Sequence, residues 1–392
     1  MRAVDVLVVG AGPAGLAVAA RLAAAGAGRV EVLEREPAAG GVPRLRRPGA
    51  ARRKAGAAEE AGAVVRTGVT ALGWSGPLAV DTVSPDGHET ITARAVVLAT
   101  GARERPRAAR LVAGTRPAGV FTTGELLRAV HGHGQRIGER AVVVGAEDVS
   151  YVAVDTLRAA GVAVSAMVTD LPRHQAPPVR AADARLRRGI PLLTGAAVTE
   201  LFGHGLLSGV GLRHRDGRTT TLACDTVVFT GDFVPENELA RRGGLELDPG
   251  TRGPAVDGAF RTGREGVFAV GNVLHAVESA DAVAREGERA ARHVVDHLAG
   301  EPWPPALRVL VEPPLRWIAP NRLAPADAYV FALRTSEFLA RPLLTVTQDG
   351  RLLHRHRLHG TAVPNRPVHV VGHWVGAVDP RGGPVRITAR HD

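Results

Sequence analysis

The chain has 392 residues and a formal net charge of +10, from 49 Lys and Arg against 39 Asp and Glu. Lys54 is its only lysine, so the excess positive charge is arginine, and aromatic residues make up only 4%. No nucleic-acid-binding motif accompanies this charge, which predicts no nucleic-acid partner but suits an anionic substrate or an acidic partner subunit. A chain of this length predicts two or three domains.

Cys224 is the single cysteine. It excludes an intrachain disulfide, a redox C-x-x-C pair and a cysteine-ligated iron–sulfur cluster within the chain, and we assign no metal-ligating set. Because Cys224 lies in the apolar run 221–229, we expect a buried small side chain rather than a reactive thiol. The absence of a signal peptide and of 18 consecutive apolar residues predicts a soluble, cytoplasmic protein without a membrane span.

The first 34 residues carry the strongest motif. The apolar run 5–9 leads into Gly10, Gly12 and Gly15 at G-x-G-x-x-G spacing, an Ala/Leu-rich stretch follows, and the apolar run 30–33 ends at Glu34. The three glycines permit a sharp turn, close approach of the backbone to a pyrophosphate, and tight packing of helix on strand. The phosphates would bind the N–H groups of the helix start, and Glu34 the ribose hydroxyls. The sequence therefore predicts a dinucleotide site.

The following residues complete this first unit. A basic, proline-broken stretch covers 44–54, and we expect a short helical piece at 57–62 and a strand at 63–66. The segments 77–83 and 90–93 predict a hairpin that turns at 85–87. The apolar run 95–99 predicts a buried strand that ends at Thr100 and Gly101.

A second strand–helix–strand pattern covers 140–144, 149–160 and 162–168. It keeps the first glycine as Gly145, but Glu147 and Ser150 stand where the second and third would be. A carboxylate at the position of close approach repels a pyrophosphate, and its Cβ takes the space that the backbone needs. The residues therefore disfavour a dinucleotide at this second site without excluding one.

An apolar run that ends at a glycine, like the one at 95–101, occurs again in 225–232 and in 265–272. The segment 280–298 has the spacing of an amphipathic helix. From residue 301, prolines separate short apolar segments that predict strands at 307–312, 329–335, 342–348, 351–358, 367–371 and 385–389. We therefore predict a discontinuous first domain (1–115 and 225–299), an inserted second domain (116–224) and a β-rich C-terminal domain (300–392).

Four of these motifs together carry a family resemblance: the glycine fingerprint, Glu34-Arg35 followed by Gly40-Gly41, the turn 99–101, and the segment 266–272. Over about residues 1–298 the chain resembles the two-dinucleotide-binding-domain flavoproteins, also called the pyridine nucleotide-disulfide oxidoreductase fold. Within this group it is similar to hydrogen cyanide synthase B, opine oxidase A and hydroxyproline dehydrogenase α subunits. The resemblance implies an α/β fold with an FAD-binding Rossmann-like domain and an inserted NAD(P)-binding-like domain.

The resemblance also implies the residues that bind FAD. They would hold the pyrophosphate, the adenosine ribose, the adenine and the ribityl chain, and they are Gly10, Gly12, Pro13, Ala14, Gly15, Glu34, Arg35, Gly41, Val42, Val69, Thr100, Gly101, Gly271 and Asn272. His275 falls where a flavin ring could be approached, although we expect a surface or capping histidine there. No catalytic residue is assigned.

Between Gly41 and Ala61 a short arginine-rich stretch replaces a longer segment that this fold threads past the isoalloxazine. Either a partner subunit supplies that wall, or the chain binds FAD without turnover. The first hypothesis is an FAD-dependent oxidoreductase of amines, imino acids or hydroxy acids, working with a second dehydrogenase or electron-transfer subunit. The alternatives are an NAD(P)H-dependent flavin reductase and a non-catalytic FAD-binding scaffold.

Overall fold

The computed structural model describes residues 2–276, 278–324 and 329–390. They group into two compact units, Met1–Ala102 with Pro235–Asp392, and Arg103–Val234. Strands β7 (Ala102–Glu104) and β17 (Phe233–Pro235) carry the chain from one unit to the other and back. The three-domain division drawn from the sequence stays a prediction.

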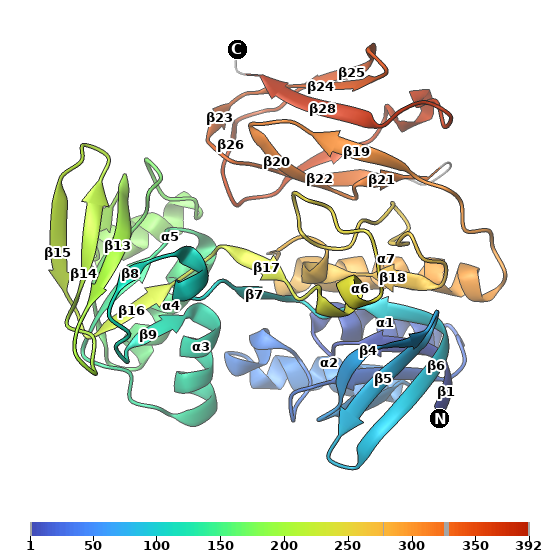
Figure 1. Cartoon of the computed structure of the whole chain (residues 1–392), viewed down its shortest axis with the longest axis horizontal. Helices are drawn as coiled ribbons and strands as arrows, with labels where there is room; N and C mark the ends of the chain where they lie inside the picture. The colour runs from blue at the N-terminus through green and yellow to red at the C-terminus, as the bar shows by residue number, and fades with distance from the viewer. Residues whose placement is uncertain (1, 277, 325–328, 391–392) are drawn as a thin grey trace. The chain divides into compact units, whose positions relative to one another are not determined.

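The first unit is built on a mixed sheet in the order β3-β2-β1-β6-β5-β4, with β18 also paired to β6. Strands β1, β2, β3, β6 and β18 run parallel, while β5 pairs antiparallel with β4 and β6. Figure 1 shows these elements in blue to cyan and yellow to orange. The bounds are β1 Arg2–Val9, α1 Pro13–Ala24, β2 Val30–Glu34, α2 Pro48–Glu60, β3 Val64–Thr67, β4 Thr70–Gly76, β5 Ala79–Ser84, β6 Gly87–Leu98, α6 Glu238–Arg242, β18 Val267–Ala269 and α7 Ala280–Leu298.

Alternate residues of the parallel strands fill two cores, one on each face of the sheet. Val8, Val97 and Phe268 face helices α1 and α7, whereas Val9 and Leu98 lie in the core on the opposite face. Both faces are covered, which explains why the parallel strands read as continuous apolar runs rather than alternating ones. Helices α1 and α7 pack so closely that a Cβ at Gly287 would overlap the carbonyl oxygen of Ala14.

The basic stretch after Gly41 differs from its expected structure. Instead of a short helical piece at 57–62, helix α2 spans Pro48–Glu60. Pro48 starts this helix rather than breaking it, because the first helical position needs no N–H donor. Ala51 and Ala58, seven residues apart, are its buried side chains.

The second unit contains a parallel sheet in the order β12-β11-β10-β16-β9 and a neighbouring sheet in the order β15-β14-β13-β8. Helix α4 follows β10 and packs on the first sheet, so the expected strand–helix–strand unit is confirmed. The bounds are β8 Ala113–Gly114, β9 Val120–Thr122, α3 Thr123–Leu127, β10 Arg140–Val144, α4 Asp148–Ala159, β11 Ala163–Val168, α5 Pro178–Ala182, β12 Leu192–Leu193, β13 Ala196–Phe202, β14 Gly209–His214, β15 Thr219–Ala223 and β16 Thr226–Phe229.

The part of the chain after residue 300 that the structure describes is rich in strands, as predicted, and is drawn orange to red in Figure 1. Two main sheets, β21-β19-β28-β24-β25 and β20-β22-β27, share a core in which Phe331 stacks on Tyr329 and Trp374. Strand β20 lies between prolines and was not expected. The bounds are β19 Leu307–Val311, β20 Leu315–Ala319, β21 Arg322–Leu323, β22 Val330–Thr335, β23 Leu339–Ala340, β24 Leu343–Gln348, β25 Arg351–Arg357, β26 Thr361–Ala362, β27 Val368–Val371 and β28 Val385–Arg390.

Candidate functional site

The parallel strands of the first unit end at one edge of the sheet, and the expected site residues follow those ends. Gly10 follows β1, Glu34 ends β2, Val69 follows β3, Thr100 follows β6, and Gly271 follows β18. Ligands of open α/β sheets bind outside the carboxyl ends of the strands. The fold therefore brings Gly10 and Gly271, which are 261 positions apart in the sequence, to one edge of the sheet.

Two glycines of the fingerprint are required by the fold itself. Gly10 has φ +109°, and a Cβ there would overlap the carbonyl oxygen of Ala99. A Cβ at Gly15 would overlap the carbonyl oxygen of Gly10. These two positions pack the strand–helix turn against itself and leave no room for a side chain.

Gly12 differs from both. It is the N-cap of α1 with φ −76° and ψ −178°, an extended conformation that any residue adopts, and no atom lies within 4 Å of a Cβ placed there. No side chain caps α1, and its first turn contains no acidic residue. Helix-start N–H groups thus face open space beside Gly12, which is the arrangement that binds a phosphate. The pyrophosphate of a dinucleotide fits here.

Glu34 is held at the end of β2 with its side chain almost inaccessible, at 8% exposure. Its Oε2 accepts from the N–H of Ala11 (3.2 Å) and its Oε1 from the N–H of Glu36 (3.0 Å). Each carboxylate oxygen retains a further lone pair for a hydroxyl donor. The two backbone bonds fix the carboxylate beside the glycine loop.

The second glycine pair adjoins this loop. The N–H of Gly40 donates to the carbonyl of Ala11 (2.7 Å), and a Cβ at Gly41, where φ is +61°, would come 3.2 Å from the Cα of Gly12. Val42 follows and is 50% exposed. Gly41 therefore lies against Gly12 of the glycine loop, and Val42 is the residue that follows it.

Three further expected residues converge on Glu236. The Thr100 hydroxyl donates to the Glu236 carbonyl (2.7 Å), and the carbonyl of Gly101 accepts from the Glu236 N–H (2.9 Å). The exposed guanidinium of Arg35 lies 3.5 Å from the Glu236 carboxylate. Glu236, which the sequence did not single out, thus ties the ends of β2 and β6 together.

The remaining expected residues already have partners within the chain. The N–H of Val69 donates to the carbonyl of Glu34 (2.9 Å), so a contact to adenine from Val69 would use its carbonyl. The N–H of Gly271 donates to Glu286 Oε2 (3.2 Å). Asn272 accepts from the N–H of Glu278 (2.8 Å) and donates to its carbonyl (3.3 Å).

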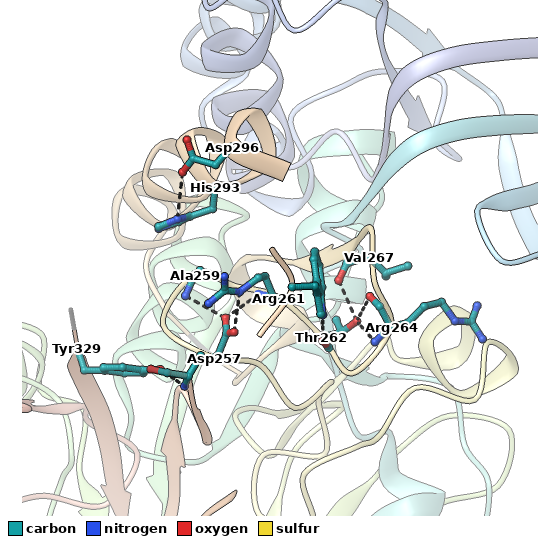
Figure 2. Close-up of polar contacts among 11 residues, drawn as sticks. Asp257, Ala259, Arg261, Thr262, Arg264, Val267, His293, Asp296 and Tyr329 are labelled. Carbon is teal, nitrogen blue, oxygen red and sulfur yellow. Dashed lines mark hydrogen bonds and ion pairs between the residues drawn. The ribbon is translucent and has the colours of Figure 1, made fainter. Parts of the chain in front are cut away.

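The segment that precedes β18 is held by its own polar contacts (Figure 2). The Asp257 carboxylate accepts from the N–H groups of Ala259 and Arg261 and from Arg261 Nε, at 2.7 to 3.0 Å. The Thr262 hydroxyl then donates to the carbonyl of Val267 (2.8 Å). These contacts fix the turn that leads into β18.

Of the surface or capping position expected for His275, the surface position is wrong, because the residue is 3% exposed. Its Nε2 lies 3.3 Å from Glu286 Oε1, and its ring lies 5.2 Å from that of Trp317 in β20. Burial lowers the pKa of His275, but the Glu286 and Glu278 carboxylates raise it more, so the net shift is upward. One sequence signal could have revealed this pair: Glu286 is an acid among the small and apolar residues of the buried face of α7, where a carboxylate needs a partner.

The glycine loop of the second unit has the same backbone and different side chains. Glu147, the N-cap of α4, has φ −87° and ψ 175°, and a Cβ at Gly231 would overlap its carboxylate. Ser150 accepts from the N–H of Glu147 (3.0 Å) and lies 2.7 Å from the Thr230 hydroxyl. The chain's own carboxylate thus stands at the helix start.

Cys224 is buried at 4% exposure, which confirms the expected buried side chain, and burial raises the pKa of its thiol to about 11. Among the described residues, no helix is long and apolar enough to cross a membrane.

Comparison with known proteins identifies the family. The family model of pyridine nucleotide-disulphide oxidoreductases matches residues 4–287. The chain is 30% identical over 334 residues to the sarcosine oxidase subunit alpha of Rhizobium meliloti (strain 1021), covering 79% of this chain and 32% of that protein. It therefore spans about a third of that relative's length.

Two solved structures share the fold. Thioredoxin reductase of T. acidophilum superposes with a TM-score of 0.65 at 23% identity, covering 76% of this chain and 100% of that one. L-proline dehydrogenase from P. horikoshii gives 0.57 at 19% identity, covering 77% of this chain and 57% of that one. The expected α/β fold, FAD as cofactor and oxidoreductase class are confirmed. The chain belongs to the pyridine nucleotide-disulphide oxidoreductase family and is an FAD-dependent oxidoreductase with a single cysteine.

Proposed function

We propose that the chain is the FAD-binding component of a heteromeric dehydrogenase or oxidase that acts on an amine, an imino acid or a hydroxy acid. The observation that carries the proposal is the contrast between two helix starts, one open at Gly12 and one occupied by Glu147. An open start suits one resident dinucleotide, and an occupied start disfavours a second. The similarity to a protein named as an oxidase subunit supports a partner.

The proposed FAD-binding residues fall into groups by their place at the sheet edge. Gly10, Gly12, Pro13, Ala14 and Gly15 would hold the pyrophosphate, Glu34 the ribose, Arg35 and Val69 the adenine, and Gly41, Val42, Thr100, Gly101, Gly271 and Asn272 the borders of the site. Pro13 suits the first helical position, because its missing N–H breaks no hydrogen bond within the helix.

Bound FAD supplies a two-electron acceptor, at flavin N5, for a hydride from the substrate. Oxidation of this kind would remove a hydride from the substrate carbon and a proton from its adjacent N–H or O–H group, giving an imine or a carbonyl. Because the chain has one cysteine, the electrons cannot continue to a cysteine pair within it. We assign the next acceptor to a partner protein, a quinone or oxygen.

An NAD(P)H-dependent flavin reductase is the second candidate. The retained strand–helix–strand unit of β10, α4 and β11 favours it. The Glu147 carboxylate opposes it, because a carboxylate at the helix start repels a pyrophosphate, a repulsion that nearby Arg110 partly offsets. We therefore rank it below the partner-linked oxidoreductase.

An anaerobic reduction experiment separates the two. The purified, FAD-loaded chain is mixed with NADH or NADPH, and separately with sarcosine, proline and hydroxyproline, while flavin absorbance is followed. The proposal expects no bleaching with either nicotinamide and bleaching with one member of the amine or imino acid set, given the partner subunit where it is needed. Rapid bleaching by NADH or NADPH alone would establish the second candidate instead.

A further inference from the structure

The segment that follows β18 touches the helix of the fingerprint. We call residues 271–276 with Glu278 the asparagine loop. Gly271 has φ +76°, and a Cβ there would come 2.8 Å from the Cβ of Ala14 in the first turn of α1. A displacement of this loop therefore changes the surroundings of the helix start at which the pyrophosphate is proposed to bind.

Buried charges hold the asparagine loop from inside. Glu286 of α7 accepts from the N–H of Gly271 with one oxygen and lies 3.3 Å from His275 Nε2 with the other. His275 Nδ1, in turn, lies 3.9 Å from Glu278 Oε1. The side chains of His275, Glu278 and Glu286 are 4%, 11% and 12% exposed, so water screens their charges little.

The strand-rich residues after 300 complete this cluster. Arg334 of β22 donates to the carbonyl of Ala276 (3.1 Å) and to Glu278 Oε1 (2.7 Å). Its guanidinium carbon lies 5.1 Å from the ring centre of Trp317, whose other ring neighbour is His275. Arg334 is 4% exposed.

Arg334 supplies one of the positive charges around the two carboxylates of the cluster and makes the short ion pair of Glu278. With His275 protonated, two cations (His275 and Arg334) face two carboxylates (Glu278 and Glu286). Arg289 adds a further positive charge near Glu286 from the exposed side of α7. Without Arg334, Glu278 loses its short ion pair and competes with Glu286 for His275, and the bond from Glu286 to Gly271 weakens.

We infer that the strand-rich segment after residue 300 acts on the flavin site, with Arg334 as a positioning residue that fixes the asparagine loop against α1 and thereby slows the release of FAD. This inference rests on the proposed assignment of Gly271 and Asn272 to the borders of the FAD site. It gives residues 300–392 a role that none of their own motifs indicates.

The test compares FAD dissociation rates among full-length variants, followed by the rise in flavin fluorescence after dilution. Arg334→Met is expected to release FAD at least tenfold faster and to alter the visible circular dichroism of the bound flavin. Arg334→Lys is expected to fall between it and the wild type. Arg386→Met is the matched control, because Arg386 lies in the same segment, is 53% exposed and faces Glu312 at 3.6 Å.

A charge-balanced double variant adds a second criterion. Arg334→Met combined with Glu278→Gln should recover most of the slow release, since it removes the unpaired carboxylate. If Arg334→Met does not fold, Arg334→Lys alone tests the inference, and we expect it to release FAD at least threefold faster than the wild type.

Wild-type release rates and dichroism in folded Arg334 variants would overturn the inference, even if their melting temperatures fall. The proposed function is judged separately, because wild-type protein that binds FAD but oxidises no substrate refutes that function and leaves the release rates informative.

Discussion

The two helix starts of this chain share a backbone and differ in what stands in front of them. Gly12 and Glu147 are both N-caps with extended dihedral angles, and no atom of the described residues lies within 4 Å of a Cβ placed at Gly12. Packing therefore explains Gly10 and Gly15 but not Gly12. A glycine that the fold does not need is best explained by a ligand that does, and the occupied start at Glu147 shows what the chain builds where no pyrophosphate is proposed.

Placing at Gly12 the glutamate that the second loop has at Glu147 should produce the largest effect on binding. Gly12→Glu should fold normally, because its conformation suits any residue, yet weaken FAD binding about a thousandfold, from a repulsion of about 4 kcal/mol at 4 Å. Fluorescence titration of the apoprotein measures this, and Gly12→Ala should lose about tenfold as the uncharged control. Equal losses in the two variants would show that charge is not the cause.

The buried carboxylate of the second unit predicts a pH effect on stability. Glu104 accepts from Thr123 Oγ1 and from the N–H groups of Gly124 and Gly231. Burial outweighs these bonds and raises its pKa from 4.5 to about 7. Since the folded pKa is raised, the stabilisation by the protonated form is complete below about pH 4.5 and is lost as pH rises through about 7.

Glu104→Gln should therefore flatten the pH dependence of unfolding between pH 5 and 8, by on the order of 3 kcal/mol at most. Denaturant titrations at several pH values measure it, with Glu139→Gln as an exposed control in the same unit. An unchanged pH slope in Glu104→Gln would show that this carboxyl ionises normally.

Replacing the carboxylate of the first loop should have a smaller effect on FAD affinity. Glu34→Gln keeps one acceptor oxygen but turns an amide toward one of the backbone N–H donors and loses charge-assisted bonds to a ribose. We expect a loss of about 30-fold, or about 2 kcal/mol. Glu36→Gln, which changes a partly exposed neighbour paired with Arg44, should alter the affinity less than twofold. Similar losses in both would place the ribose elsewhere.

Replacing Glu147 with the glycine of the first loop should give the smallest of these effects on binding. Glu147→Gly opens the start of α4 and should tighten NADH or NADPH binding about tenfold, because it removes one repulsive charge but leaves Ser150 at the third glycine position. Quenching of protein fluorescence during nicotinamide titration measures it. If the wild type already binds NADH or NADPH tightly and Glu147→Gly binds them no better, Glu147 does not keep a dinucleotide from the second loop.

The sequence predicted those parts of the site that depend on local rules. The fingerprint, Glu34 and the substitution at Glu147 are read from spacing within about 25 residues, and the strands follow from apolar runs. It missed features that distant contacts decide. These are helix α2, which begins at Pro48 and packs against α1, and strand β20, which lies between two prolines. The burial of His275 was also missed, because its partners Glu286 and Trp317 come from separate elements.

FAD titration of the Gly12→Glu apoprotein, with its melting temperature measured beside the wild type, tests whether the start of α1 is the pyrophosphate site. We expect an unchanged melting temperature without FAD, one FAD per wild-type chain, and no measurable uptake by the variant at concentrations that saturate the wild type. Wild-type FAD affinity in Gly12→Glu would contradict this assignment, since the open space at the start of α1 would then not be the pyrophosphate site.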